Sequence, residues 1–383
     1  MTHETELLFS LLRFSLSGTP PATTECSAET IEKLYRLSRC HSVVHIIGDA
    51  LYKSGLLPPD SPFAEKFERQ QLELLQRYAF QEQERARIIT ALNTAGVPFI
   101  LLKGAVLRQY YPDPYLRSSC DIDVLVHRED LERAQDALKT MLGYKGDGKL
   151  TSHDVSLFSE SGVHIELHYD LMEDSDVNNG AAVLSRVWEY ATPEQEGSSC
   201  YLMTDAMFYF YHIAHMAKHI RSSGCGVRPF MDLWILEHVV EHDSAARDAL
   251  LRQGELLTFA TAARRLCEHW FSNVTADEDT RRFSAFILGY GETETVVAVH
   301  RRSDTGKGRY LLRRVFPPYS QLEFRYPVLQ RHKGLLPAMW VRRWFALLSP
   351  QKRRRMQAEW QANTAVSAER ANEVARLFDD LEL

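Results

Sequence analysis

Two aspartates, Asp121 and Asp123, stand one residue apart at the start of a short apolar run that ends at Val126. Side chains alternate across a β-strand, so these two carboxylates point to the same face. Neighbouring carboxylates repel each other unless a cation neutralises them. Because ligand sets made only of oxygen favour Mg²⁺ or Mn²⁺ over zinc, the pair predicts a site for such ions.

A third acid, Glu166, lies on a second candidate strand at residues 163–169. Period-two alternation puts His164, Glu166 and His168 on one face and apolar residues on the other. We therefore expect Glu166 to complete the metal site, either as a ligand or as the general base for an incoming hydroxyl. The two histidines fit two interpretations: they orient a metal ligand, or they are half-exposed strand residues.

The elements around these acids predict a small α/β core over residues 93–175. An apolar run of strand length at 97–102 ends at Lys103 and Gly104. A helix is expected over 128–142, where a glycine closes it. Strands at 154–159 and 163–169, joined by a Glu-Ser-Gly turn, predict a hairpin.

The rest of the chain has mainly helical patterns, which makes the expected fold class α+β. The predicted divisions are an N-terminal helical region at 1–92, the core at 93–175, a helical domain covering the cleft at 176–300, and a basic, aromatic C-terminal region at 301–383. Apolar spacing predicts one long charged helix over 63–93 and further helices over 205–220, 231–241 and 245–270.

The run FILLKGAVLRQYYPDPYLRSSCDIDVLV, residues 99–126, resembles the signature of bacterial uncharacterised nucleotidyltransferases, a family of the DNA polymerase beta-like superfamily. Later segments such as HIELHYDL extend the resemblance to roughly residues 90–350. It implies a polymerase beta-like core between helical regions, and metal-dependent transfer of a nucleoside monophosphate from a nucleoside triphosphate to a hydroxyl or phosphate acceptor, with release of pyrophosphate. Asp121, Asp123 and Glu166 match the three carboxylates of that superfamily.

The residues expected to handle phosphates follow the first strand and precede the acids. Many superfamily members have Gly-Ser after that strand, with the serine on a terminal phosphate; this chain has Lys103-Gly104 followed by alanine. Gly104 lets backbone approach a phosphate, and Lys103 can supply charge. Arg117, Ser118 and Ser119 are further candidates for phosphate oxygens, and a solvated loop with serine-capped turns is the alternative.

Three histidines, His212, His215 and His219, fall on one face of a predicted helix. We expect this face, with Arg228 and Asp232, near the active site, and His215 and Arg228 among the nucleotide-binding residues. A polar helix face that lines the cleft or packs under it is the alternative, and we favour it over a metal or phosphate site. A His/Asp metal phosphohydrolase is a rival function, and a catalytically silent nucleotide-binding or interaction module is another.

The composition of the chain limits which partners and which cellular compartment we expect. The chain is 45% hydrophobic and 25% charged, and its six cysteines have no metal-like spacing. The N-terminus lacks the features of a signal peptide and no run approaches ~20 apolar residues, so we expect a cytoplasmic protein without a transmembrane segment. Net charge is −6, yet residues 301–356 hold 15 Lys or Arg against two acids.

That basic segment indicates an anionic partner, for which nucleic acid and a membrane surface, reached through an amphipathic helix at 337–348, are candidates. A solvated basic face is the alternative. The resemblance itself implies a nucleoside triphosphate as substrate and an acceptor that is a small molecule, a peptide or a protein side chain.

Overall fold

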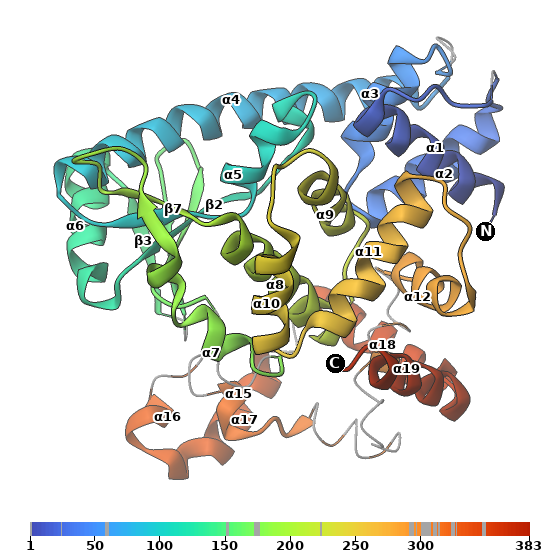
Figure 1. Cartoon of the computed structure of the whole chain (residues 1–383). Coiled ribbons are helices and arrows are strands. Elements are labelled where there is room, and N and C mark those ends of the chain that lie inside the picture. Colours follow the sequence, from blue (N-terminus) through green and yellow to red (C-terminus); the bar gives the residue numbers. More distant parts are fainter. Residues whose placement is uncertain are drawn as a thin grey trace. The chain divides into compact units, whose positions relative to one another are not determined.

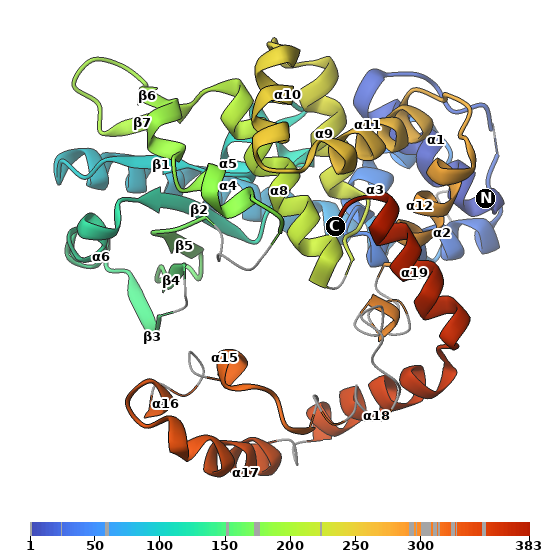
Figure 2. The same cartoon turned by 60° about the horizontal axis from the view of Figure 1, so that its bottom comes forward.

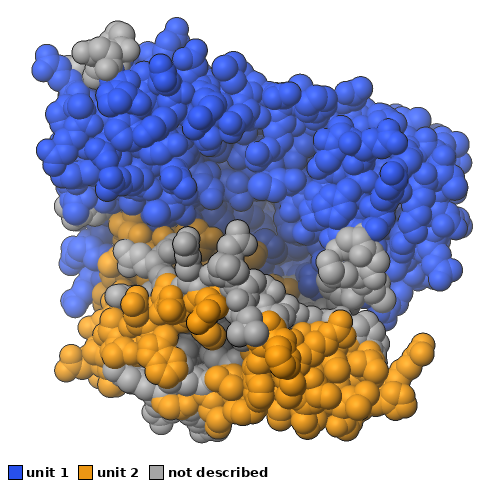
Figure 3. Space-filling view, turned by 180° about the vertical axis from the view of Figure 1, so that it is seen from behind, with its two compact units in different colours: residues 1–217, 226–281 blue, residues 218–225, 282–383 orange. Residues whose placement is uncertain are grey.

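The computed structural model describes residues 2–23, 25–57, 61–150, 153–171, 177–222, 224–290, 295, 297–299, 308, 312, 315–322, 326, 328–346 and 350–383. The fold is α+β, as predicted. The chain divides into two compact units: the first comprises residues 1–217 and 226–281, and the second comprises 218–225 and 282–383. Figure 3 shows the two units in different colours.

The first unit holds a seven-stranded mixed sheet in the order β3-β4-β5-β2-β1-β7-β6. Its strands are β1 (Phe99–Leu101), β2 (Asp121–Val126), β3 (Lys145–Leu150), β4 (Asp154–Phe158), β5 (His164–His168), β6 (Ala191–Pro193) and β7 (Cys200–Met203). At its centre β2 is antiparallel to β1 and parallel to β5. The predicted hairpin of β4 and β5 is confirmed as an antiparallel pair.

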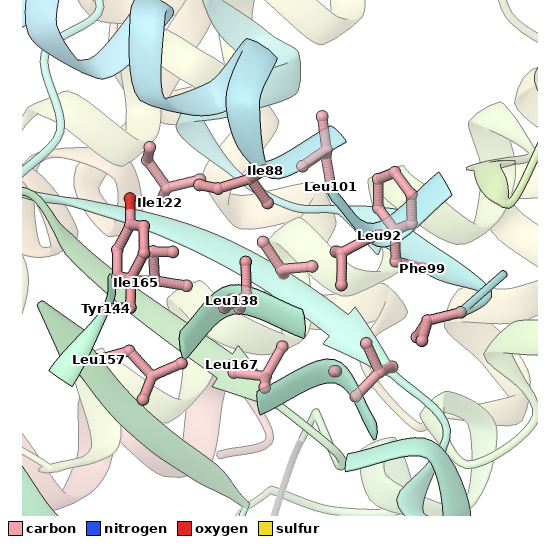
Figure 4. Close-up of a cluster of buried hydrophobic side chains, with 14 of the residues drawn as sticks. Ile88, Leu92, Phe99, Leu101, Ile122, Leu138, Tyr144, Leu157, Ile165 and Leu167 are labelled. Carbon is pink, nitrogen blue, oxygen red and sulfur yellow. The ribbon is translucent and has the colours of Figure 1, made fainter. Parts of the chain in front are cut away.

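One face of this sheet is apolar and forms the core of the unit. Every second residue of β2 and β5, including Ile122 and Ile165, is buried on this face. Ile88 and Leu92 of α4 (Ala64–Thr94) and Leu138 of α6 (Leu131–Leu142) pack against them (Figure 4). Since side chains alternate, the intervening positions of β2, β5 and β4 meet on the opposite face, and these are mostly polar.

The remaining helices of the first unit join segments that are distant in sequence (Figure 1). Besides short 3-10 turns they are α1 (His3–Ser17), α2 (Ala28–Cys40), α3 (Val44–Lys53), α5 (Gly104–Leu107), α7 (Gly180–Leu184), α8 (Asp205–Ser222, whose last residues belong to the second unit), α9 (Arg228–His238), α10 (Ser244–Gln253) and α11 (Leu257–Phe271). Phe9 of α1 stacks on Trp270 of α11 at 4.7 Å between ring centroids, and Arg13 donates a hydrogen bond to the Trp270 carbonyl at 2.8 Å. The N-terminal helices therefore share a core with helices near residue 270.

The second unit is helical in its described parts (Figure 2). Its helices are α12 (Glu278–Leu288, which begins in the first unit), α15 (Tyr319–Leu322), α16 (Val328–Arg331), α17 (Leu336–Ala346), α18 (Pro350–Ala365) and α19 (Ala368–Asp380). Within it Phe286 packs edge-on against Phe378, and Leu322, Tyr326 and Leu329 form a small buried cluster.

The segment 337–348, a candidate for a membrane surface, mostly corresponds to α17; residues 347–349 lie outside the described residues. The indole N–H groups of Trp340 and Trp344 donate to the carbonyls of Pro317 and Val315, both at 2.9 Å. Phe316 lies edge-on to both indole rings. Both tryptophans thus contact the preceding segment of the same unit. No helix of the described chain is long and apolar enough to cross a membrane.

Three features differ from the sequence expectation. Strands β6 and β7 lie inside 176–300, a segment expected to be helical, and β7 pairs in parallel with β1. Strand β3 was not anticipated. The single helix expected over 245–270 is two helices, because α10 ends at Gly254 and Glu255 adopts a positive φ of 56°.

Candidate metal centre

The three predicted carboxylates lie together on the polar face of the sheet. In the parallel pairing of β2 with β5, Asp121 stands beside His164 and Asp123 stands beside Glu166. The side chain of Asp123 is only 3% exposed, whereas that of Glu166 is 27% exposed. Two adjacent strands therefore present three acids on one face, the arrangement that the alternation of these strands predicts.

Lys103 lies directly against this cluster. Its ammonium Nζ is 2.8 Å from Asp123 Oδ1. The backbone at Lys103 has φ 43° and ψ −118°, a conformation that side-chain-bearing residues rarely adopt and that costs about 1–3 kcal/mol. Strand β1 ends just before it and α5 begins just after it, so the strained residue is the turn that brings the ammonium to the acids. Strain of this kind is characteristic of functional positions.

His168 links two of the carboxylates. Its Nε2 lies 3.0 Å from Asp123 Oδ1 and 3.5 Å from Glu166 Oε2. Lys103 and His168 both use the same oxygen of Asp123, and no hydrogen bond from the described residues reaches Oδ2. Oδ2 is thus left for a further ligand.

The pKa values of the three acids are shifted in different directions. Burial, together with the charges of Asp123 and Glu166, raises the pKa of Asp121. Burial would also raise the pKa of Asp123, but Lys103 and His168 outweigh it and hold this pKa well below its usual range. The hydrogen bond from His168 lowers the pKa of Glu166. Asp121 is therefore the carboxylate whose negative charge is least compensated.

The pKa values of the two cationic groups, Lys103 and His168, are both raised. Burial opposes charge on Lys103, but Tyr211, Asp123 and Glu166 together raise its pKa above the ordinary value. Burial also opposes charge on His168, yet the hydrogen bonds to Asp123 and Glu166 raise its pKa. Three carboxylates face one permanently charged ammonium, so the cluster favours additional positive charge.

Helix α8 contributes Tyr211 to the surroundings of the acids. Burial raises the pKa of Tyr211, and the charges of Lys103 and the acids also act on it, which places the phenol close to them. The ring of His215 lies 6.0 Å from that of Tyr211. His219 belongs to the second unit. His212 turns elsewhere and donates from Nε2 to the Pro229 carbonyl at 2.9 Å.

Gly104 packs tightly against the loop that precedes β2. A Cβ added at this glycine would lie 3.2 Å from Cβ of Ser119 and 3.3 Å from Nη1 of Arg117. The carbonyl of Gly104 accepts a hydrogen bond from Arg108 Nε at 3.0 Å, and Arg108 Nη2 reaches Ser119 Oγ at 3.1 Å. The Lys-Gly turn and the pre-strand loop are therefore held together as one piece.

Arg117, a candidate for phosphate contacts, is buried and engaged inside the protein. Its Nε donates to Asp232 Oδ1 at 2.6 Å and its Nη1 donates to the Ser118 carbonyl at 2.7 Å. Tyr111 donates to the same Asp232 oxygen at 2.7 Å. Arg228 also donates to the Ser118 carbonyl, at 3.2 Å. This network ties α9 to the loop that leads into β2.

The groups of described residues close enough to share a metal ion include the acids of β2 and β5. One group is Asp121, His164 and Glu166; a second is Asp123, Glu166 and His168; a third is His153, Asp154 and His168. The set of the phosphohydrolase interpretation, which comprises His212, His215, His219 and Asp232, forms no such group within the described chain.

Two residues near the acids were missed from the sequence: Tyr211 and Asp154. Asp154 lies directly opposite His168 in the β4–β5 register. The predicted hairpin, with its turn at 160–162, already implied this pairing. The position of Tyr211 depends on how α8 packs, which no local sequence pattern predicts.

Comparison with protein families gives a match between residues 27–272 and the model of the uncharacterised nucleotidyltransferase family. The chain belongs to this family. No curated protein and no solved structure matches it. The matched region contains the Lys-Gly turn, the three acids and α8, and it ends before the basic segment that starts at residue 301. Membership supports nucleotidyl transfer as the general class of activity.

Proposed function

We propose that the chain transfers a nucleoside monophosphate from a nucleoside triphosphate to a hydroxyl or phosphate acceptor and releases pyrophosphate. The observation that carries this proposal is the placement of Asp121, Asp123 and Glu166 on one face of two adjacent parallel strands, beside Lys103. The proposal includes a polymerase beta-like core made of β1, β2, β5 and their helices.

The cluster fits a divalent cation of the magnesium type. Its carboxylate oxygens are the ligands that Mg²⁺ and Mn²⁺ prefer. Asp121 has a raised pKa because its negative charge is buried near two others, and Asp123 keeps Oδ2 available. Asp121, Asp123 and Glu166 would hold the ion, which supplies charge stabilisation for the phosphates and lowers the pKa of an attacking hydroxyl.

The other side chains would prepare the site for the triphosphate. Lys103 keeps Asp123 ionised and presents a fixed positive charge at the acids. His168 holds Asp123 and Glu166 in one orientation through Nε2. Tyr211 of α8 is buried beside Lys103 and the acids and would help to exclude water from them. Glu166, the more exposed acid, is the candidate to accept a proton from the acceptor.

In this proposal Arg117 and Arg228 position the loop that precedes β2, because both donate to the Ser118 carbonyl. Arg117 is buried and donates to Asp232 and the Ser118 carbonyl, so in this proposal it orients the loop of Ser118 and Ser119. Ser119 is bonded to Arg108 and to Gln81. Gly104 allows the close packing that fixes this loop beside Lys103.

The test determines which phosphate of the nucleotide is transferred. Each of the four nucleoside triphosphates, labelled at the α- or the γ-phosphate, is incubated with Mg²⁺, the protein and a metabolite extract. We expect α-label in a product or on the protein, and γ-label only in pyrophosphate. Asp123→Asn abolishes the transfer, and Asp136→Asn, an exposed aspartate of α6, leaves it unchanged. Transfer that survives Asp123→Asn contradicts the proposal.

The ion pair of Lys103 with Asp123 favours a second candidate, a silent module in which the ammonium replaces the cation. Such a module binds nucleotides without Mg²⁺ and transfers no label to any acceptor. Nucleotide affinity that is unchanged by a chelator, together with the absence of α-label transfer, would select this alternative.

A further inference from the structure

A second cluster of ligand-type side chains lies behind His168, at the end of the β4–β5 hairpin. It consists of His153, Asp154 and His168, each of which offers one ligand atom within 4.8 Å of the others. Asp154 is the direct partner of His168 across the antiparallel pair. The carbonyl of His153 accepts a hydrogen bond from Tyr169 N at 2.9 Å, so its backbone is fixed to the strand end that carries His168.

The hydrogen bonds of His168 determine which ring nitrogen is available. Nε2 faces Asp123 and Glu166, and because carboxylates only accept, Nε2 carries the proton. The neutral ring then has its lone pair on Nδ1. That atom is buried and has no hydrogen-bond partner within the described part of the chain, and the His168 side chain is only 6% exposed. A buried acceptor without a donor is unfavourable unless a cation or a donor reaches it.

We propose that Nδ1 of His168, His153 and Asp154 bind a transition-metal ion of the zinc class. Two imidazole nitrogens with one carboxylate suit zinc and not magnesium, and three protein ligands leave a fourth position for water. A histidine that binds metal commonly donates its other N–H to a carboxylate, the relation that His168 has with Asp123.

The chemistry of the ligands would then direct a magnesium-type ion and a zinc-type ion to different sites. The acids of β2 and Glu166 offer oxygen, whereas the second cluster offers nitrogen from His153 and from Nδ1 of His168. His153 is 24% exposed, which gives the ion a route from solvent. Metal at Nδ1 polarises Nε2–H and tightens its hydrogen bond to Asp123. This last consequence rests on the proposed function; binding of the ion does not.

The test measures zinc affinity directly. Untagged, full-length protein is stripped with a chelator, dialysed, and titrated with Zn²⁺ against a chromophoric competitor. We expect one tight site for which His153→Ala weakens affinity more than about 100-fold, since loss of an outer partner alone costs 10–100-fold. His3→Ala, an exposed histidine of α1, is the matched control and leaves affinity unchanged. Circular dichroism melts establish that each variant is folded.

Further variants separate this site from the acids. Asp121→Asn is expected to retain zinc, and His168→Gln to lose it; cobalt in place of zinc gives visible absorption bands that disappear in His153→Ala. Zinc affinity unchanged in His153→Ala, or lost in Asp121→Asn, overturns the proposal, and the second result would assign the ion to the carboxylates. Either failure leaves the Mg²⁺-dependent transfer of label untouched, so the two proposals fail independently.

Discussion

Replacing Asp121 and Asp123 by asparagine should change the stability of the metal-free protein in opposite directions. The folded-state pKa of Asp121 is raised, so its ionised form costs stability at neutral pH, and that cost disappears as pH falls through the folded-state pKa. The folded-state pKa of Asp123 is lowered, so its ionised form adds stability above the unfolded pKa, and the gain is lost as pH falls. The two variants are compared at pH 7.5, well above the ordinary carboxyl pKa.

The magnitudes follow from the geometry. Residues two apart on a strand are separated by roughly 6.6 Å, and two unit charges at that distance repel by about 2.5 kcal/mol at an effective dielectric of 20. Because Lys103 offsets part of the charge of Asp123, we expect Asp121→Asn to raise the free energy of unfolding by about 1 kcal/mol. Asp123→Asn breaks a buried ion pair and should lower it by about 3 kcal/mol.

Equilibrium urea denaturation followed by circular dichroism, at pH 7.5 with a chelator present, measures both values. Asp136→Asn serves as the control and should stay within ±0.5 kcal/mol of the parent. Mg²⁺ should stabilise the parent protein and neither active-site variant. If both substitutions destabilise the protein to a similar extent, Asp121 does not carry an uncompensated charge, and the reasoning about the cluster is refuted.

Substitutions at three other positions test the surroundings of the acids. Gly104→Ala forces a Cβ to 3.2 Å from Ser119 and should cost about 1–3 kcal/mol in stability and reduce transfer; a Tm equal to that of the parent would contradict the close packing. Lys103→Gly and Lys103→Ala both remove the ammonium, but Gly relieves the positive φ, so urea denaturation should show Lys103→Gly to be more stable by about 1 kcal/mol, and the reverse order would exclude backbone strain. Asp232→Asn leaves the guanidinium of Arg117 buried without its anion and should cost about 3–5 kcal/mol by the same assay, whereas a loss below 1 kcal/mol would mean that the pair does not hold the loop.

The central part of the fold was predictable because its signals are local. Alternation on β2 and β5 placed three acids on one face, and the Glu-Ser-Gly turn identified the β4–β5 hairpin. Gly143 ends α6 with a positive φ of 74°, as a C-terminal glycine indicates. Each of these features depends on neighbours within a few residues.

The remaining features depend on contacts between distant segments. Strand β7 has only four residues and is recruited by pairing with β1, about 100 positions earlier. Arg117 has the sequence context of a phosphate ligand, and only the approach of Asp232 from α9 explains its burial. The second nitrogen-rich cluster depends on the register of β4 with β5, and no spacing rule for metal ligands contains it.

Binding of Mn²⁺, followed by electron paramagnetic resonance in the presence of a non-hydrolysable nucleoside triphosphate, tests the carboxylate centre most directly. Mn²⁺ prefers oxygen ligands and substitutes for Mg²⁺. We predict binding that is lost in Asp121→Asn, Asp123→Asn and Glu166→Gln but retained in Asp136→Asn and in His153→Ala. Mn²⁺ binding that persists when these carboxylates are removed would contradict the claim that they form the metal centre.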